Sequence, residues 1–192
     1  MANAVNLPGE RLAGMLQDLL AKLRAGNITL DQLDAFLQHR NPFESVIAGL
    51  PLPEGTVIRR VKVDRNRTPQ EVVDATGRTR YLNLNEDVLA TMPLGEGDEV
   101  DVYFVPTNRF VSVQEVPAFL ARYGLVPDPR AQAAVNEADP ACADERPNGS
   151  QWGKNCYLAF GRWCGERSVS CNRSDVDWDG SWFLSGVPAP RK

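Results

Sequence analysis

Hydrophobic residues in the first forty positions recur at the 3.6-residue spacing of an amphipathic helix. Six of them form one stripe: Leu12, Met15, Leu16, Leu19, Leu20 and Leu23. Gly26 suits the end of this helix, and Thr29 with Gln32 forms a capping-box pattern that opens a second one. Asn41-Pro42 ends the second helix. We therefore expect residues 1–50 to form a helical hairpin, whose role in packing or oligomerisation the sequence leaves open.

Residues 51–109 have the pattern of a small α+β region. Two segments, 57–63 and 99–105, are rich in β-branched residues, as strands are. Between them, Thr68 to Glu71 has a capping signature that opens a short helix, which ends near Gly77.

Helical spacing returns between residues 110 and 138. One helix is predicted near 115–123, and it stops at Gly124. Asp128-Pro129 opens another, because aspartate suits the N-cap and proline the first turn. Residues 139–151 are rich in Pro, Asp, Asn and Ser, and are expected to form an irregular connection.

The C-terminal segment has a different pattern. It contains all four tryptophans of the chain: Trp152, Trp163, Trp178 and Trp182. Helical periodicity is weak and turn formers are frequent, so the segment predicts short strands and long loops. Large residues alternate here with small or polar ones. The tryptophans could fill the core of a small all-β cap, or they could be the scaffold of a contact surface whose Ser, Gly and Asn residues adapt to a ligand.

Two sets of positions define this mixture. The large, rigid residues are Phe160, Arg162, Trp163, Glu166, Arg167, Val169, Arg173, Trp178, Trp182 and Phe183. The interspersed positions are Gly161, Cys164, Gly165, Ser168, Ser170, Asn172, Ser174, Val176, Asp177, Asp179, Gly180 and Ser181.

Composition and charge narrow the classes of function. Hydrophobic residues make up 43% and charged residues 24% of the chain, which is ordinary for a globular protein. No apolar run approaches the roughly 20 residues of a membrane helix, and the N-terminus has no signal-peptide pattern. The default location is the cytoplasm, with association to a virion or cell surface as an alternative. A net charge of −4 argues against nucleic acid as a partner.

The residues that usually carry chemistry are sparse. His39 is the only histidine, and the four cysteines (Cys142, Cys156, Cys164 and Cys171) form no C-x-x-C pair. No catalytic residue, metal site or cofactor is therefore expected. Whether the cysteines pair as disulfides or stay as thiols is open. The run from Asp175 to Gly180 matches the opening of an EF-hand loop, but Gly186 stands where the closing glutamate should be.

A family resemblance appears in the same segment. Cys156 to Trp163, followed by Glu166-Arg167, Arg173, Trp178 and the run from Trp182 to Val187, resembles the variable proteins of diversity-generating retroelements. Residues 134–140 and 148–152 are similar to the same family. The likeness covers about residue 125 to the C-terminus and is weaker over 57–124.

The resemblance implies a C-type lectin fold for residues 110–192, with a variable region at about 157–187. It also implies that a template repeat is reverse-transcribed with its adenines scrambled. The twelve interspersed positions would then be varied ligand contacts, and the four tryptophans scaffold. Scrambling the adenines of an Asn codon that ends in a pyrimidine never yields Trp, Met, Lys, Gln or Glu, and none of the twelve positions holds one of these residues.

The sequence thus predicts a non-enzymatic ligand-binding protein of class α+β with a hypervariable C-terminal surface. Its partner would be a protein or cell-surface ligand of unknown identity, and its oligomeric state is open. One alternative is a phage or prophage receptor-binding or adhesion protein with a fixed surface. A second is a catalytic relative of the formylglycine-generating enzymes, which share a related fold.

Overall fold

The computed structural model describes residues 9–26, 28–30, 33, 50–81, 84–153, 155–173 and 177–190. The chain forms two units, residues 1–46 and 47–192. In the first unit, helix α1 spans Gly9–Arg24, and Gly26 follows it with a φ of +73°, as its predicted role as a stop requires. The second predicted helix, from Thr29 to Asn41, lies almost entirely outside the described residues.

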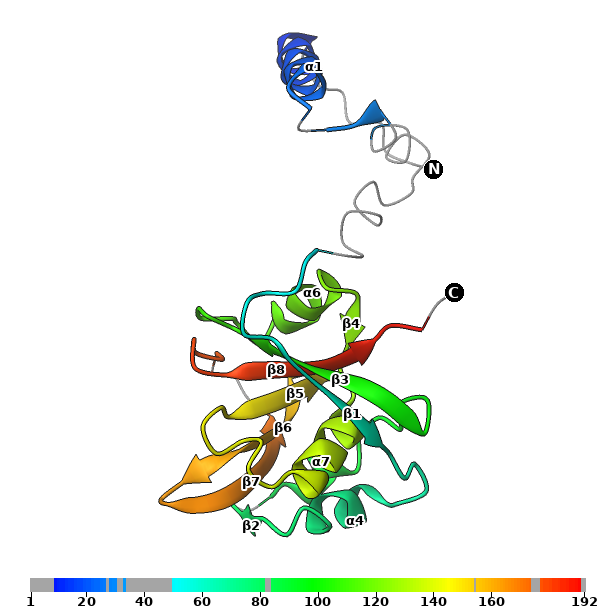
Figure 1. Ribbon diagram of the computed structural model, residues 1–192. Helices are drawn as coiled ribbons and strands as arrows, with labels where there is room; N and C mark the ends of the chain where they lie inside the picture. The colour runs from blue at the N-terminus through cyan, green and yellow to red at the C-terminus, as the bar shows by residue number, and fades with distance from the viewer. Residues whose placement is uncertain are drawn as a thin grey trace. The chain divides into compact units, whose positions relative to one another are not determined.

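The second unit is built on one mixed sheet (Figure 1). Its described strands are β1 Val57–Lys62, β2 Thr79–Arg80, β3 Glu99–Pro106, β4 Leu125–Val126, β5 Asn148–Trp152, β6 Cys156–Trp163, β7 Glu166–Arg173 and β8 Phe183–Pro188. Seven of them follow the order β1-β3-β8-β5-β6-β7-β2, and β4 pairs with β8 outside this path. The predicted α+β class is confirmed.

The sheet joins segments that the sequence analysis separates. Strand β3, from the region 51–109, pairs antiparallel with β8, from the region 110–192. Strand β2 pairs parallel with β7, with Thr79 opposite Ser168. The two regions therefore share one sheet and belong to one unit. The boundary expected at residue 109 therefore does not fall between two structural units. Strands that are remote in sequence pair across it and join the two regions.

Short helices cover the sheet, and local capping signals predict two of them. The described helices of this unit are α4 Pro69–Asp74, α5 Glu86–Leu89, α6 Val116–Ala121 and α7 Pro129–Ala138. Thr68 and Glu71 form the predicted capping box of α4, and the Asp128 carboxylate accepts a hydrogen bond from the amide of Ala131 to cap α7. Helix α7 lies against the sheet beside β1 (Figure 1).

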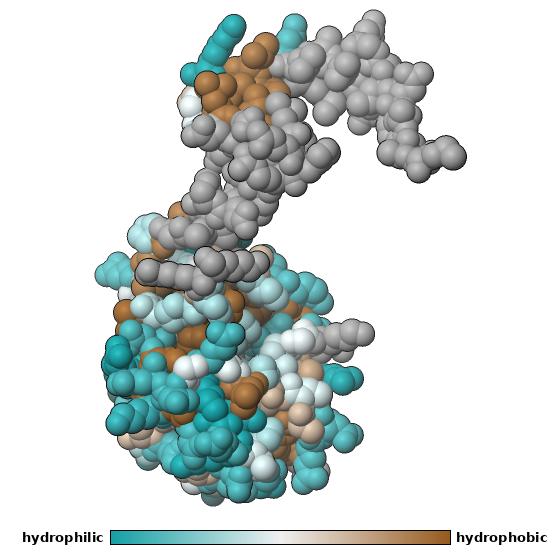
Figure 2. Space-filling view, turned by 90° about the vertical axis from the view of Figure 1, so that its right-hand side faces the viewer, coloured by the Kyte–Doolittle hydropathy of each residue, from teal (hydrophilic) through white to brown (hydrophobic). Residues whose placement is uncertain are grey.

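The core lies on both faces of this sheet. Phe160, Leu158 and Val169 are fully buried on the side that α7 covers, and Leu184 and Val105 on the other side. The surface of the second unit that Figure 2 shows carries mainly hydrophilic residues, with hydrophobic ones scattered among them. Burial on both faces makes β5, β6 and β8 the centre of the fold, and the predicted variable region begins there.

Candidate functional site

Strands β6 and β7 form a hairpin closed by a two-residue turn. The turn residues Cys164 and Gly165 both have positive φ angles, 53° and 82°, as a type I′ turn requires. Glycine adopts this conformation freely, whereas a cysteine there carries a steric cost. Each strand is eight residues long, so the expectation of short strands and long loops is wrong for this part of the segment. The turn sequence keeps the strands in register over their whole length.

One face of the hairpin is part of the core. Leu158, Phe160, Val169 and Cys171 alternate along the two strands, and each is at most 1% exposed. Burial raises the pKa of the Cys171 thiol to about 12, because a thiolate would lose its solvation there. Cys171 therefore behaves as an apolar core residue and not as a reactive thiol.

The opposite face carries the interspersed residues. Cross-strand pairs place Gly161 opposite Ser168, Ala159 opposite Ser170 and Tyr157 opposite Asn172. Because side chains on a strand alternate between faces, Ser168, Ser170 and Asn172 point together to the side away from Phe160. Four of the predicted varied positions thus share one face of one hairpin.

An open pocket of about 320 Å³ lies over this face. It is lined by Tyr81, Tyr157, Ala159, Trp163, Ser170, Asn172, Asp177, Trp178, Asp179 and Trp182. The structure therefore brings four predicted varied positions and three predicted scaffold tryptophans together. The volume is at the lower end of the range of small-ligand sites.

Five aromatic rings form a continuous arc in this pocket. The ring centroid of Trp163 lies 5.2 Å from that of Tyr81 and 6.3 Å from that of Trp182. The Trp182 ring stands edge-on to Trp178 at 4.9 Å, and Trp178 stands edge-on to Tyr157 at 5.9 Å. Edge-to-face pairs are a favoured arrangement of aromatic rings, so the two T-shaped contacts of Trp178 help to hold the arc.

Trp178 is the most firmly held ring of the arc. Its backbone forms an isolated β-bridge with Val111, and its indole NH donates to Oε1 of Gln151 at 3.0 Å. Gln151 in turn donates to the carbonyl of Val113 at 2.6 Å. The indole packs over Gly149, where an added Cβ would lie 2.3 Å from the ring. A glycine is therefore needed beneath Trp178.

The rim of the pocket carries carboxylates. Asp179 is half-buried, and its Oδ1 accepts hydrogen bonds from the amide and hydroxyl of Ser181, at 2.7 and 2.5 Å. These two donors lower the pKa of Asp179, so its carboxylate stays ionised at neutral pH. Asp177 is exposed. Thr107 donates to the backbone carbonyl of Asp179, which ties the rim to the loop after β3.

The positions predicted to vary differ in exposure. Cys164, Gly165, Asp177, Gly180 and Ser181 are exposed, and Ser170, Asn172 and Asp179 are half-buried. Ser174 and Val176 lie outside the described residues. Gly161 and Ser168 are buried, so their side-chain positions are not open to a ligand as those of the other described positions are. Trp163 folds over Gly161, and an added Cβ there would lie 3.2 Å from its ring.

The tryptophans divide into two groups. Trp163, Trp178 and Trp182 line the pocket; Trp178 is buried and the other two are half-buried. Trp152 is buried in the core cluster on the face of Phe160, and its indole NH donates to the Thr91 hydroxyl at 3.1 Å. Trp152 therefore supports the fold outside the pocket.

No sequence pattern points to Tyr81, which lines the pocket, or to Arg78, which supports the hairpin from the core side. Tyr81 reaches the pocket because β2 pairs with β7, and a two-residue strand leaves no periodic signal. Arg78 is buried and donates to the carbonyls of Gly161 and Pro140, at 3.3 and 2.8 Å. Its guanidinium also lies over the Phe160 ring, 5.4 Å from the centroid. Only the three-dimensional pairing reveals either residue.

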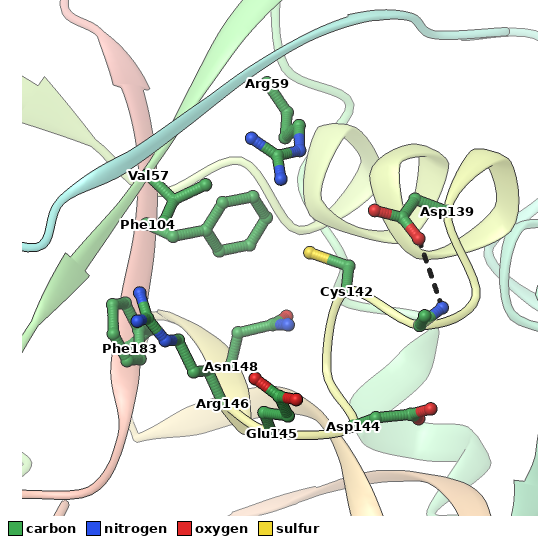
Figure 3. Close-up of a pocket in the computed structure, with 11 residues that line it drawn as sticks. Val57, Arg59, Phe104, Asp139, Cys142, Asp144, Glu145, Arg146, Asn148 and Phe183 are labelled. Atoms are coloured by element: carbon green, nitrogen blue, oxygen red, sulfur yellow. Dashed lines mark hydrogen bonds between the residues drawn. The ribbon is translucent and has the colours of Figure 1, made fainter.

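A second cavity, of about 380 Å³, lies on the other face of the sheet (Figure 3). Phe104, Phe183, Arg59 and Cys142 line it, and none of the predicted varied positions does. Figure 3 shows the Cys142 thiol and the Arg59 guanidinium turned toward its middle. Burial raises the pKa of the Cys142 thiol, which disfavours a thiolate there.

Comparison of the chain with known protein families, curated proteins and solved structures finds no match. Within the described ranges, no group of three or more His, Cys, Asp or Glu side chains could hold a metal ion. No helix in the described part of the chain is long and apolar enough to cross a membrane.

Proposed function

We propose that the protein is a non-enzymatic ligand-binding protein whose C-terminal surface is diversified by a retroelement. Residues 110–192 would form its C-type-lectin-like part, completed by strands from residues 51–109. The aromatic pocket over the β6–β7 hairpin would be the centre of the binding surface.

One observation carries the proposal: the hairpin separates its residues by face. Ser170 and Asn172 line the pocket, while the neighbouring Val169 and Cys171 are buried in the core. Substitutions at surface positions usually change stability by less than about 0.5 kcal/mol, whereas truncations in a core cost several. Such a hairpin lets the binding surface change while the fold persists, as diversification requires.

Contacts from outside the hairpin support the same proposal. Thr107 fixes the Asp179 backbone, Val111 fixes Trp178, and Tyr81 closes the arc. None of these three residues belongs to the predicted variable region. A fixed frame around the varied positions would keep the pocket in place when those positions change.

Binding is tested by selection from a library. Ser170, Asn172, Asp177, Asp179 and Ser181 are randomised in the full chain, and the pool is selected against a panel of unrelated folded proteins. We expect specific binders that retain the parental melting temperature. A matched library randomised at Leu158, Phe160, Val169 and Cys171 should yield none, because its members unfold. A pocket-face pool that folds and yields no binder would contradict the binding role.

Diversification is tested in the genome. A near-copy of the region that encodes about residues 157–187 should lie close to the gene, beside a reverse-transcriptase gene. Mismatches between the copies should fall at template adenines and cluster at the varied codons. A complete genome without such a near-copy would remove the retroelement and leave a binding module with a fixed surface.

A further inference from the structure

The side chains that line the aromatic pocket are of few chemical kinds. Five of its lining residues carry aromatic rings, two carry carboxylates, and none of the described residues that line it is Lys, Arg or His. The two carboxylates, of Asp177 and Asp179, lie on the same rim segment as Trp178. The other polar side-chain groups of the lining are those of Ser170 and Asn172, the Tyr81 and Tyr157 hydroxyls and the indole NH groups of the tryptophans. The lining therefore combines aromatic faces with negative charge alone.

We propose that this pocket binds a cationic alkylammonium group, such as a methylated ammonium on a small molecule or on a lysine side chain. The inference rests on the proposed binding function and adds the ligand's chemistry. It holds for this sequence, since Asp177 and Asp179 stand at positions predicted to vary.

The rings supply the first part of the attraction. An aromatic face carries partial negative charge and attracts a cation within about 6 Å of the ring centroid, with tryptophan the strongest of the aromatic side chains. The arc of Tyr81, Trp163, Trp182, Trp178 and Tyr157 places neighbouring centroids 4.9–6.3 Å apart around the pocket. One alkylammonium group in the pocket would therefore contact several ring surfaces. Its methyl groups would also bury apolar area against them.

The carboxylates supply the second part. Ser181 holds Asp179 in place and favours its ionised form, so the rim is negative throughout the neutral pH range. A neutral apolar ligand would contact the same rings but gain nothing from the carboxylates. An anionic ligand, such as a phosphate or carboxylate, would be repelled by them. The Tyr157 hydroxyl is hydrogen-bonded to the Ser170 hydroxyl at 3.2 Å, and the Tyr157 ring stands nearly perpendicular to that of Trp178.

The test compares choline with its neutral isostere, 3,3-dimethylbutan-1-ol, which replaces the charged nitrogen by carbon and keeps the shape. The full chain with Trp152→Phe is used, because this change removes the tryptophan that lies outside the pocket and leaves three reporters at the site. We expect choline to change the fluorescence in a saturable way and the isostere to bind at least about tenfold more weakly. The amide of N-acetyl trimethyllysine is titrated in parallel. Its binding relative to choline distinguishes a methylated lysine side chain from a free small molecule as the ligand.

Matched variants test whether the carboxylates of the rim cause the preference for choline. Asp177→Asn with Asp179→Asn should weaken choline binding severalfold and leave the isostere unchanged. Asp87→Asn, an exposed carboxylate on α5, is the control and should change neither. Equal binding of choline and isostere, or binding of neither, overturns the cation assignment. The library selection decides separately whether the pocket face binds ligands at all, so the two failures are distinguishable.

Discussion

The two faces of the β6–β7 hairpin come from the same sixteen residues of strand, yet they do different work. Toward α7, Leu158, Phe160 and Val169 are fully buried among apolar neighbours. On the opposite side, Ser170, Asn172 and the half-buried Trp163 surround an open pocket. The period-two geometry of a strand keeps each face independent of the other. One hairpin thus places core packing and the lining of a pocket on separate, alternating side chains.

The separation has two exceptions on the pocket face. Gly161 is covered by Trp163, and Ser168 is buried opposite it. Both lie near the closed end of the hairpin, where Arg78 reaches the Gly161 carbonyl from the core side. We therefore expect tolerance to substitution to be greatest at Ser170 and Asn172, and to fall toward the turn.

The largest expected effect on stability comes from a substitution on the core face of the hairpin. Phe160→Ala should cost about 3–5 kcal/mol of the free energy of unfolding, because it deletes a fully buried ring and leaves a cavity. Urea denaturation measures it. The matched change on the pocket face, Asn172→Ala, should stay within about 0.5 kcal/mol. Similar losses for the two variants would mean that the faces do not differ in the way described.

The second-largest expected effect comes from a substitution at Gly149, beneath the Trp178 ring of the pocket. Gly149→Ala should cost about 1–3 kcal/mol, because the new Cβ would lie 2.3 Å from the Trp178 ring and must displace it. The displaced indole should also change the tryptophan fluorescence spectrum of the folded protein. Ala75→Gly, at an exposed position just after α4 and outside the pocket, is the control and should leave the spectrum unchanged. An unaltered spectrum in Gly149→Ala would contradict the placement of Trp178.

A smaller effect depends on pH. The pKa of Cys171 is raised to about 12 in the folded state, so above the ordinary thiol pKa only the unfolded chain gains by ionising. The contribution of the Cys171 thiol to the free energy of unfolding is therefore fully present below about pH 8.5, and it is lost as the pH rises toward 12. At pH 10 the loss should be about 1–2 kcal/mol. Comparison of Cys171→Val with the parent by urea denaturation at pH 7 and pH 10 measures it. An equal pH dependence in the two proteins would show that Cys171 is not protected by burial.

The smallest expected effect on stability comes from a substitution in the turn that joins β6 and β7. Cys164 has a positive φ, which asparagine adopts more readily than cysteine. Cys164→Asn should therefore raise the free energy of unfolding by about 0.5–1 kcal/mol. Cys164→Ser, which lacks that preference, should change it little. A loss of stability in the asparagine variant would argue against a type I′ turn.

Local signals explain the parts of the fold that the sequence predicts well. The capping box at Thr68 and Glu71 and the N-cap at Asp128 depend on residues three positions apart, so the positions where α4 and α7 begin follow from the chain alone. Ser168, Ser170 and Asn172 also recur at intervals of two, which a strand turns into one face.

Non-local pairing explains what the sequence leaves out. Nothing near Tyr81 indicates that it joins a pocket with Trp163, because a two-residue strand brings it there. The same holds for β3, whose pairing with β8 unites regions expected to be separate. The burial of Gly161 depends on where the Trp163 ring folds, which is a matter of packing and leaves no pattern in the sequence.

A saturation scan of residues 156–173, scored for folding by protease resistance of the displayed chain, tests the central claim most directly. We expect tolerance to alternate with a period of two, with Ser170 and Asn172 accepting most residues, and with Leu158, Phe160, Val169 and Cys171 accepting few. We also expect reduced tolerance at Gly161 and Ser168. Tolerance that is uniform along both strands, or that is highest at the core-facing positions, would contradict the account.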